Sequence, residues 1–331
     1  MTNITKKTPH KRNTSVELLR FFFMFCIVID HIYGHGSGLN YEWLYGLGKD
    51  WTTAPHLVMF NIGKIGVTGF MFISGYYGIR INKNKIIHLL AITTTYAVVL
   101  DAIYGFTLHS AINDLHAFDL WWFVKDYLFV CLLSPFIEMG IKNVSRHTFQ
   151  MVIVGVAFVS YFAHLISFDN SHDLTMLLSI YLIARYLKLC PPPLPYQHAG
   201  KAAIIGIIII GLVPTLASII NLPYKLQKLW FSNNNIIFLL TSWMLVVFAF
   251  RHHTYNKVVN TLASSVLAIY LITDSAQLRP YDKDIFPIVL EWWGYLVAMG
   301  ICLGCILIDK VRIFLTESFI KIITRVIKRR K

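Results

Sequence analysis

The sequence predicts an all-α, polytopic membrane protein with about ten transmembrane helices in one bundle and both termini in the cytoplasm. Three features of its 331 residues support this class. First, 56% of the residues are hydrophobic and only 14% are charged, whereas a soluble domain carries about 25% charged residues. Second, apolar runs of bilayer-spanning length recur along the chain. Third, Lys and Arg gather in both tails and in alternate loops.

The apolar windows are the candidate spans. Inside a bilayer each backbone polar group must be satisfied within its own segment, so runs of this length are expected to be helices. The proline-rich stretch PPPLPY interrupts the pattern between the sixth and seventh windows and indicates a loop. The windows lie at about 16–34, 58–79, 86–108, 120–141, 149–168, 173–189, 201–220, 235–250, 258–275 and 287–308.

The distribution of charge predicts the orientation. The net charge is +13, and the positive-inside rule assigns the Lys- and Arg-rich tails and loops to the cytoplasm. Because this charge marks topology, nucleic acid is excluded as a partner. We expect a basic cytoplasmic tail over 1–14 and a membrane domain over 15–309. A basic amphipathic cytoplasmic tail over 310–331 follows, and it either lies on the inner membrane surface or only stops transfer.

The five cysteines are expected to be small buried hydrophobes. Cys302 and Cys305 have a C-x-x-C spacing, but no second pair accompanies them, so no metal site is predicted.

The first apolar run carries charges that a membrane span normally excludes. Residues 16–33, VELLRFFFMFCIVIDHIY, contain Glu17, Arg20, Asp30 and His31. A charged group within a span costs about 2.5–3.5 kcal/mol on insertion scales, so such groups usually face a protein interior and mark a site. Glu17, Arg20 and His31 share one helix face, with Arg20 and His31 roughly 16 Å apart along the axis.

The charged residues of the predicted spans divide between the two ends of their helices. In the predicted topology, Arg20 and Arg185 lie toward the cytoplasmic ends of their helices. His31, Asp101, Asp126 and Asp274 lie toward the outer ends. This polarity suits an anionic donor that enters from inside and a neutral hydroxylated acceptor outside.

Five blocks, in order, resemble the acyltransferase-3 family of membrane proteins that acylate bacterial surface glycans. The most specific is Arg20 followed by ten residues and His31, within ELLRFFFMFCIVIDH. In this sequence Thr273 and then Asp274 stand where the family commonly has a histidine after Tyr-Leu-Ile, which makes Asp274 the nearest polar substitute. The other blocks are VTGFMFISGYYG (67–78), LWWFVKDYLFVCLLSPF (120–136), SNNNIIFLLTSWMLVVFAF (232–250) and LASSVLAIYLITDS (262–275).

The resemblance implies an O-acyltransferase in the bacterial cytoplasmic (inner) membrane. It moves an acetyl or similar small acyl group from acyl-CoA to a hydroxyl of a surface polysaccharide or lipid-linked sugar precursor. Acetyl-CoA is then a donor substrate, and no permanently bound cofactor is expected. The expected partners are this donor, the glycan acceptor and the lipid bilayer. The membrane domain either delivers the acyl group itself or passes it to a separate extracytoplasmic transfer protein.

Each candidate residue has a chemical reason. His31 and Arg20 are the predicted catalytic residues: an imidazole takes and returns a proton near neutral pH, and a guanidinium forks onto a phosphate or carbonyl. His31 carrying the acyl group covalently is a variant of the same mechanism. Donor binding is assigned to Arg20, Ser74, Tyr76, Arg80, Lys83, Lys85 and Arg185, and acceptor binding or support to Glu17, Asp30, Asp101, Trp122, Asp126 and Asp274.

Other interpretations stay open at this level. Arg20 can serve only as an i, i+3 ion-pair partner of Glu17, and Asp30 can pair with another helix. The basic loops can do no more than set topology, and Trp122 can be an interfacial aromatic. A polytopic transporter or flippase of glycan precursors without acyl transfer also fits ten helices with buried charges, although no inverted repeat is visible.

Overall fold

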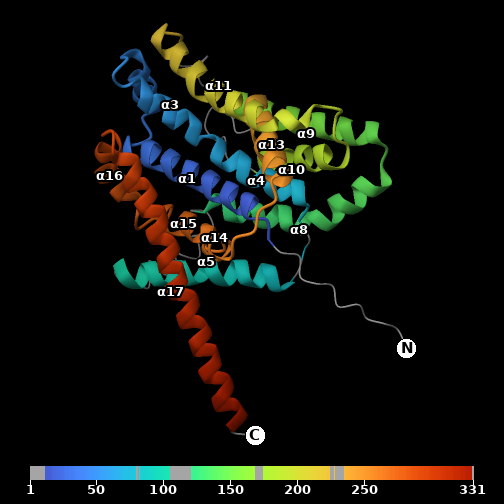
Figure 1. Cartoon of the computed structure of the whole chain (residues 1–331), viewed down its shortest axis with the longest axis vertical. Coiled ribbons are helices and arrows are strands. Elements are labelled where there is room, and N and C mark those ends of the chain that lie inside the picture. The colour runs from blue at the N-terminus through green and yellow to red at the C-terminus, as the bar shows by residue number, and fades with distance from the viewer. Residues whose placement is uncertain are drawn as a thin grey trace.

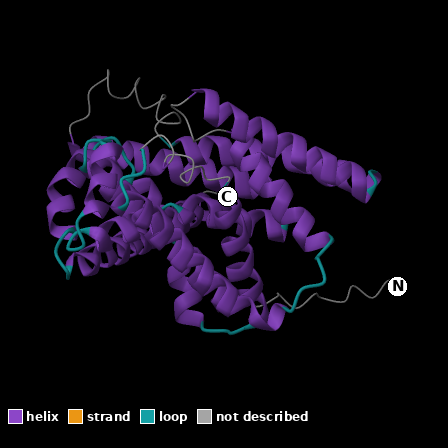
Figure 2. Cartoon of the chain, turned by 90° about the horizontal axis from the view of Figure 1, so that it is seen from above, coloured by secondary structure: helices purple, strands orange, loops and turns teal. Residues whose placement is uncertain are grey.

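A computed structural model describes residues 12–79, 81, 83–104, 121–167, 174–223, 227 and 235–329, and within these ranges every regular element is a helix. Each predicted apolar window contains helix, and the helices are joined by loops (Figure 2). The elements are α1 (Thr14–Gly36), α2 (Tyr41–Gly46), η1 (Leu47–Lys49), α3 (Ala54–Gly63), α4 (Ile65–Tyr77), α5 (Lys83–Tyr104), α8 (Trp122–Asn143), α9 (Arg146–Ser167), α10 (Leu174–Leu189), η2 (Tyr196–His198), α11 (Ala199–Ile219), α13 (Ile236–Arg251), α14 (Lys257–Ala263), α15 (Val266–Thr273), η4 (Arg279–Tyr281), α16 (Asp282–Val289) and α17 (Gly294–Arg329).

Several helices have the length and composition of membrane spans. In the described part of the chain, the stretches Ala54–Tyr77, Lys83–Tyr104 and Tyr196–Ile219 are long and apolar enough to cross a bilayer. Two shorter apolar stretches, Ile236–Arg251 and Lys257–Thr273, accompany them. The all-helical fold and these apolar helices are compatible with a membrane protein, while the count of ten spans and the cytoplasmic termini stay predictions.

Helix α1 runs through the middle of the bundle (Figure 1). It begins at Thr14 because the side chain of Asn13 accepts a hydrogen bond from the Ser15 amide, which satisfies one free N–H of the first turn. The side-chain Nδ2 of Asn13 also donates a hydrogen bond to the Ala249 carbonyl of α13. Helices α3, α4, α13, α14, α15, α16 and α17 all contact α1. A helix surrounded in this way buries side chains on most of its faces, so its polar residues reach protein groups or internal cavities.

Helix α4 approaches both α1 and α10 through glycines. A Cβ at Gly69 would lie 2.1 Å from the Phe23 ring of α1. A Cβ at Gly75 would lie 2.7 Å from the Tyr181 carbonyl oxygen and 2.9 Å from the Ala184 Cβ of α10. Small residues therefore let the helix backbones pack closely, as is typical of membrane bundles.

We expect Gly75→Ala to lower the free energy of unfolding of the detergent-solubilised protein by about 1–3 kcal/mol, and so to lower its melting temperature. The added methyl group meets the Tyr181 backbone and forces α4 and α10 apart. Gly140→Ala is the matched control, since a Cβ at Gly140 in α8 meets no atom within 4 Å. Melting curves followed by size-exclusion fluorescence measure the difference. Equal melting of the two variants would contradict the close packing of α4 on α10.

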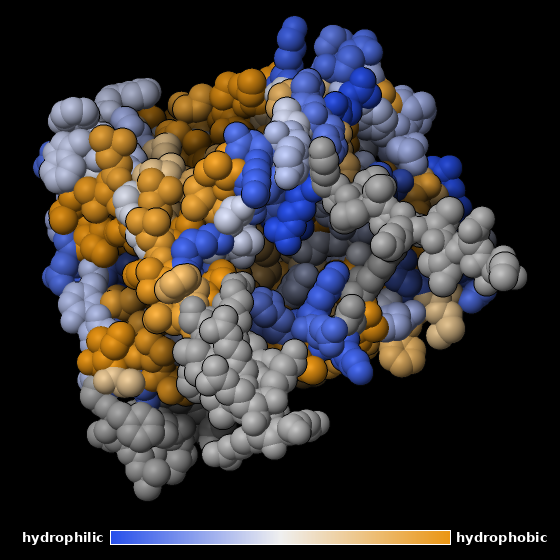
Figure 3. All heavy atoms as spheres, turned by 60° about the horizontal axis from the view of Figure 1, so that its bottom comes forward, coloured by the Kyte–Doolittle hydropathy of each residue, from blue (hydrophilic) through white to orange (hydrophobic). Residues whose placement is uncertain are grey.

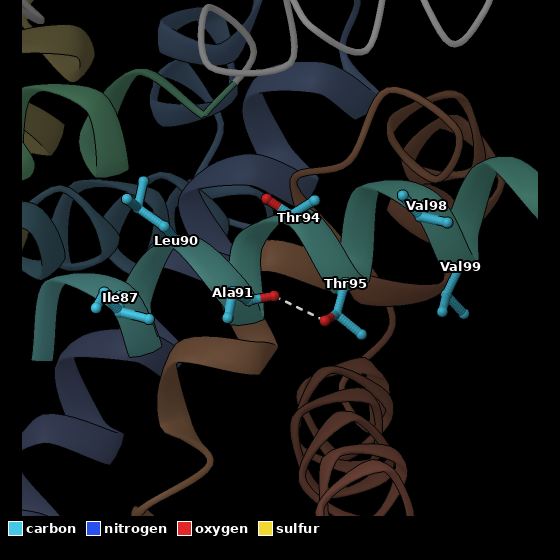
Figure 4. Close-up of a pocket in the computed structure, with 7 residues that line it drawn as sticks. All are labelled: Ile87, Leu90, Ala91, Thr94, Thr95, Val98 and Val99. Carbon is cyan, nitrogen blue, oxygen red and sulfur yellow. Dashed lines mark hydrogen bonds between the residues drawn. The ribbon is translucent and has the colours of Figure 1, made fainter. Parts of the chain in front are cut away.

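The surface carries apolar areas that suit contact with lipid (Figure 3). On α5, exposed Ile87, Val98 and Val99 line a shallow hollow of about 580 Å³ (Figure 4). On the same helix, the Thr95 hydroxyl donates to the Ala91 carbonyl 2.7 Å away, so its polar group is satisfied without water (Figure 4).

Helix α17 is held to α5 by a buried carboxylate. Asp309, only 1% exposed, accepts hydrogen bonds from the Tyr96 hydroxyl of α5 at 2.8 Å and from Arg312 Nε at 2.7 Å. The helix continues without a break through the predicted boundary at 309 and 310, and its last part extends beyond the other helices (Figure 1). Whether this segment lies on a membrane surface stays a prediction.

Candidate active site

Arg20 lies between two cavities beside the N-terminal half of α1. Its Nη1 donates to Glu17 Oε1 at 2.8 Å, and its side chain remains 34% exposed. The larger cavity has a volume of about 510 Å³ and the smaller about 270 Å³, and Arg20 lines both. Ser74 and Tyr127 also line both cavities, while Lys85 lines the larger one and Arg12 the smaller. This region is a pair of hollows with both cationic and apolar side chains in their walls.

The structure brings only part of the predicted donor site together. Ser74 and Lys85 join Arg20 at the larger cavity. Tyr76 is not among the lining residues: its ring packs 4.9 Å from that of Phe250, with Lys188 Nζ 4.7 Å from the Tyr76 centroid. Lys83 is exposed at the start of α5, and Arg80 lies outside the described residues.

Arg185 is bound to a carboxylate that the sequence prediction did not include. Its Nε and Nη2 donate to Glu138 Oε1 and Oε2 at 2.6 and 2.7 Å, and the Tyr181 hydroxyl donates to Glu138 at 3.0 Å. This two-point pair ties α8 to α10. The guanidinium also sits behind Gly78, where a Cβ would lie 2.9 Å from Arg185 Cζ. Arg185 therefore supports the wall of the larger cavity, and contact with a donor phosphate would require Glu138 to release it.

His31 borders a third, smaller cavity of about 130 Å³. Its Nδ1 lies 3.7 Å from Oδ1 of Asp274, which is 1% exposed, and Arg279 Nε donates to the same oxygen at 2.8 Å. The rings of His31 and His35 stack with centroids 5.3 Å apart, and His35 Nδ1 lies 3.1 Å from Asp282 Oδ2. Two histidine–carboxylate pairs thus lie side by side, with Thr273, Tyr281 and Asp282 in the cavity wall.

A row of aromatic rings connects the two ends of the polar stripe. The Tyr270 ring lies 6.0 Å from His31 and 6.0 Å from Phe123, and Phe123 stacks on Tyr127 at 5.9 Å. Phe123 and Tyr127 line the smaller cavity together with Arg20. Packed aromatic side chains, and not an open channel, therefore lie between the hollow beside Arg20 and His31.

The other predicted polar residues occupy separate places. Lys64 Nζ lies 2.7 Å from Asp30 Oδ1 and 4.8 Å from the Phe60 ring centroid. Asp101 is buried and accepts a hydrogen bond from Gln277 at 2.7 Å. Asp126 is buried on α8, and Trp122 packs edge-on against Phe123 with ring centroids 5.9 Å apart. Of the predicted acceptor residues, Asp274 is the one that pairs with His31.

Sequence reasoning missed several partners of these groups. Glu138 lies inside an apolar window, so the criterion that singled out Arg20 applies to it equally. Arg279 and Asp282 follow the window that ends near 275, in a loop where charge is unremarkable. Lys64 interrupts the window at 58–79, and Tyr270 lies inside the Ser-rich block without standing out from it.

The arrangement combines a cationic hollow with a histidine that contacts a buried carboxylate. The cations suit an anionic ligand, and the imidazole suits proton transfer at a hydroxyl. Together they can bind a charged donor at one end of the helix face and move a proton at the other.

A comparison with protein families gives one match: the acyltransferase domain family, acyltransferase-3, over residues 13–308. No curated protein and no solved structure matches the chain. The matched residues include α1 with Arg20 and His31, and every cavity described above is built from them apart from Arg12. The chain therefore belongs to the acyltransferase-3 family and is an acyltransferase.

Proposed function

We propose that this acyltransferase moves an acetyl group from acetyl-CoA to a hydroxyl of a surface polysaccharide or lipid-linked sugar precursor in the bacterial cytoplasmic membrane. The observation that carries the proposal is the placement of Arg20 and His31 on α1. Arg20 borders a cationic hollow, His31 borders a second cavity, and roughly 16 Å of helix separates them.

The hollow beside Arg20 is the expected donor site. Coenzyme A carries several phosphates, and Arg20, Lys85 and Arg12 supply positive charge around the two cavities. Glu17 occupies one nitrogen of the Arg20 guanidinium, which has five N–H donors in all. The remaining donors can form a fork with a phosphate or with the carbonyl oxygens of the pantetheine arm.

The thioester must then travel along α1 to reach His31. The rings of Tyr127, Phe123 and Tyr270 lie between the hollow at Arg20 and the imidazole, so they must move apart for the pantetheine arm to pass. An extended, uncharged pantetheine arm is compatible with aromatic walls, whereas the phosphates stay with the cations. The donor thus reacts at one end of the helix face while it is bound at the other.

At His31, acyl transfer needs one proton to move twice. The imidazole takes the proton of the acceptor hydroxyl as its oxygen attacks the thioester carbonyl carbon. The tetrahedral oxyanion collapses, the C–S bond breaks, and the imidazolium returns the proton to the departing thiolate. An O-acetyl ester and free coenzyme A are the products, and His31 ends in its starting state.

The direct test is transfer of label from radioactive acetyl-CoA to the host glycan fraction in membranes that contain the protein. We expect label in the glycan that mild base removes, and none in membranes without the protein. Label from succinyl-CoA but not from acetyl-CoA would replace the acyl group in the proposal. Movement of lipid-linked sugar across the membrane without acyl transfer would overturn it in favour of a flippase.

A further inference from the structure

We infer that Asp274, held in place by Arg279, is a positioning residue that fixes the orientation and tautomer of the His31 imidazole. In this arrangement Nδ1 of His31 carries its proton toward Asp274, and Nε2 keeps the lone pair that accepts the proton of the acceptor hydroxyl. The catalytic part of this inference rests on the proposed acyl transfer.

Three buried atoms at this contact have no partner within hydrogen-bonding distance among the described residues: His31 Nδ1, Asp274 Oδ2 and the hydroxyl oxygen of Tyr270, which faces Asp274. A buried polar atom left without a hydrogen bond destabilises the folded protein. His31 Nδ1 already lies 3.7 Å from the other oxygen of the same carboxylate. This separation is longer than a hydrogen bond, and catalytic hydrogen bonds are often long until substrate binds.

Arg279 fixes the carboxylate. Its Nε donates to Asp274 Oδ1 at 2.8 Å, and the Arg279 amide donates to the Ser275 carbonyl at 3.0 Å. Asp274 itself caps the C-terminus of α15, with its amide bonded to the Tyr270 carbonyl at 2.9 Å. The acid and its cation therefore come from one short turn, and the guanidinium pairs with the carboxylate in a site where Asp274 is 1% exposed.

The tautomer of His31 follows from the hydrogen-bonding capacity of the Asp274 carboxylate. An ionised carboxylate only accepts hydrogen bonds, so the ring nitrogen that faces it must carry the proton. The opposite nitrogen is then a base, as in serine hydrolases, where a buried aspartate orients a histidine in the same way. An asparagine at 274 can instead donate its N–H to Nδ1, which stabilises the tautomer with a protonated Nε2 and removes the base.

The kinetic test compares Asp274→Asn with the same substitution at a second buried Asp–Arg pair, Asp309 and Arg312. We expect Asp274→Asn to lower kcat about 10²–10³-fold with KM for acetyl-CoA within about twofold, and Asp274→Glu to recover part of the loss. Asp309 is the control: it is equally buried and bound through Nε of Arg312 at 2.7 Å, but it pairs with Tyr96 and not with a histidine. Asp309→Asn is expected to keep kcat per folded molecule.

A double substitution separates positioning from structure. If Asp274 acts through His31, then Asp274→Asn has no further effect on the residual rate of His31→Gln. A further loss of tenfold or more in the double variant, or a fall in kcat for Asp309→Asn as large as that for Asp274→Asn, would overturn the assignment.

A second measurement needs no activity. In ¹⁵N-histidine-labelled protein in lipid bilayers at pH 8, the His31 signals are those lost in His31→Gln. We expect Nδ1 to be protonated and Nε2 unprotonated in the unsubstituted protein, and this pattern to be lost in Asp274→Asn. The same tautomer in both proteins overturns the positioning role. If the tautomer changes as expected but no acetyl is transferred, the positioning role stands and the proposed function fails.

Discussion

Replacement of His31 by glutamine is expected to reduce acetyl transfer about 10²–10⁴-fold, the range that a positioned general acid–base group contributes. The amide keeps a polar side chain beside Asp274 but cannot accept a proton and return it. Initial rates with radiolabelled acetyl-CoA and the glycan acceptor measure the loss. The amount of inserted protein, determined by immunoblot of washed membranes, normalises the rates.

His35 provides the matched control for this prediction. It lies one turn further along α1, stacks on His31 at 5.3 Å and has its own carboxylate partner in Asp282. We expect His35→Gln to keep transfer within about threefold, since the base would still be present. Normal transfer by a well-inserted His31→Gln protein would contradict the proposed mechanism. Equal losses in the two variants would assign the proton transfer to the histidine pair instead.

The covalent variant of the mechanism gives a different result in the same membranes. If His31 carries the acyl group, label from acetyl-CoA accumulates on the protein when acceptor is absent, and it is lost in His31→Gln. If His31 is only a base, the protein stays unlabelled and acceptor is required before any coenzyme A is released. A single incubation without acceptor therefore separates the two mechanisms.

Hydropathy and backbone chemistry were enough to predict the helical fold. Each apolar window contains helix because a bilayer leaves a long apolar run no other regular structure. The same windows did not show where helices break. The window at 58–79 is divided at Lys64 between α3 and α4, and the window at 258–275 is divided at Ser264 and Ser265 between α14 and α15. One or two polar residues change the mean hydropathy of a window too little to mark such a break.

The part of the candidate site that could be predicted consists of charged residues within apolar runs of the sequence. Arg20 and His31 stood out because they interrupt an apolar helix, and both border cavities. Arg185 met the same criterion, but Glu138 binds it at two points. Sequence alone does not tell a paired charge from one that is open to a ligand, because the partner comes from a different helix. The pairing of His31 with Asp274 likewise depends on how α15 packs against α1.

Replacement of Arg20 by alanine is expected to raise KM for acetyl-CoA about 10- to 100-fold with a smaller change in kcat. A hydrogen bond to a charged group contributes about 1.5–3 kcal/mol, and Arg20 is the cation that both hollows share. Arg20→Lys should recover only part of the affinity, since an ammonium keeps the charge but loses the planar fork. Steady-state rates over a range of acetyl-CoA concentrations separate the two parameters.

Two companion variants keep this result interpretable. Arg20→Ala leaves the Glu17 carboxylate, whose side chain is 7% exposed, without its cation, and such a loss can destabilise the helix bundle by itself. The double variant Glu17→Gln/Arg20→Ala removes that stranded charge, so a KM that stays high in it reports donor binding. Arg146→Ala is the matched surface control, because Arg146 also lies over a tyrosine ring, 5.8 Å from the Tyr186 centroid compared with 5.9 Å for Arg20 and Tyr77. If KM returned to normal in the double variant, Arg20 would be a structural partner of Glu17, and the donor phosphates would have to be held by Lys85, Arg12 or other cations.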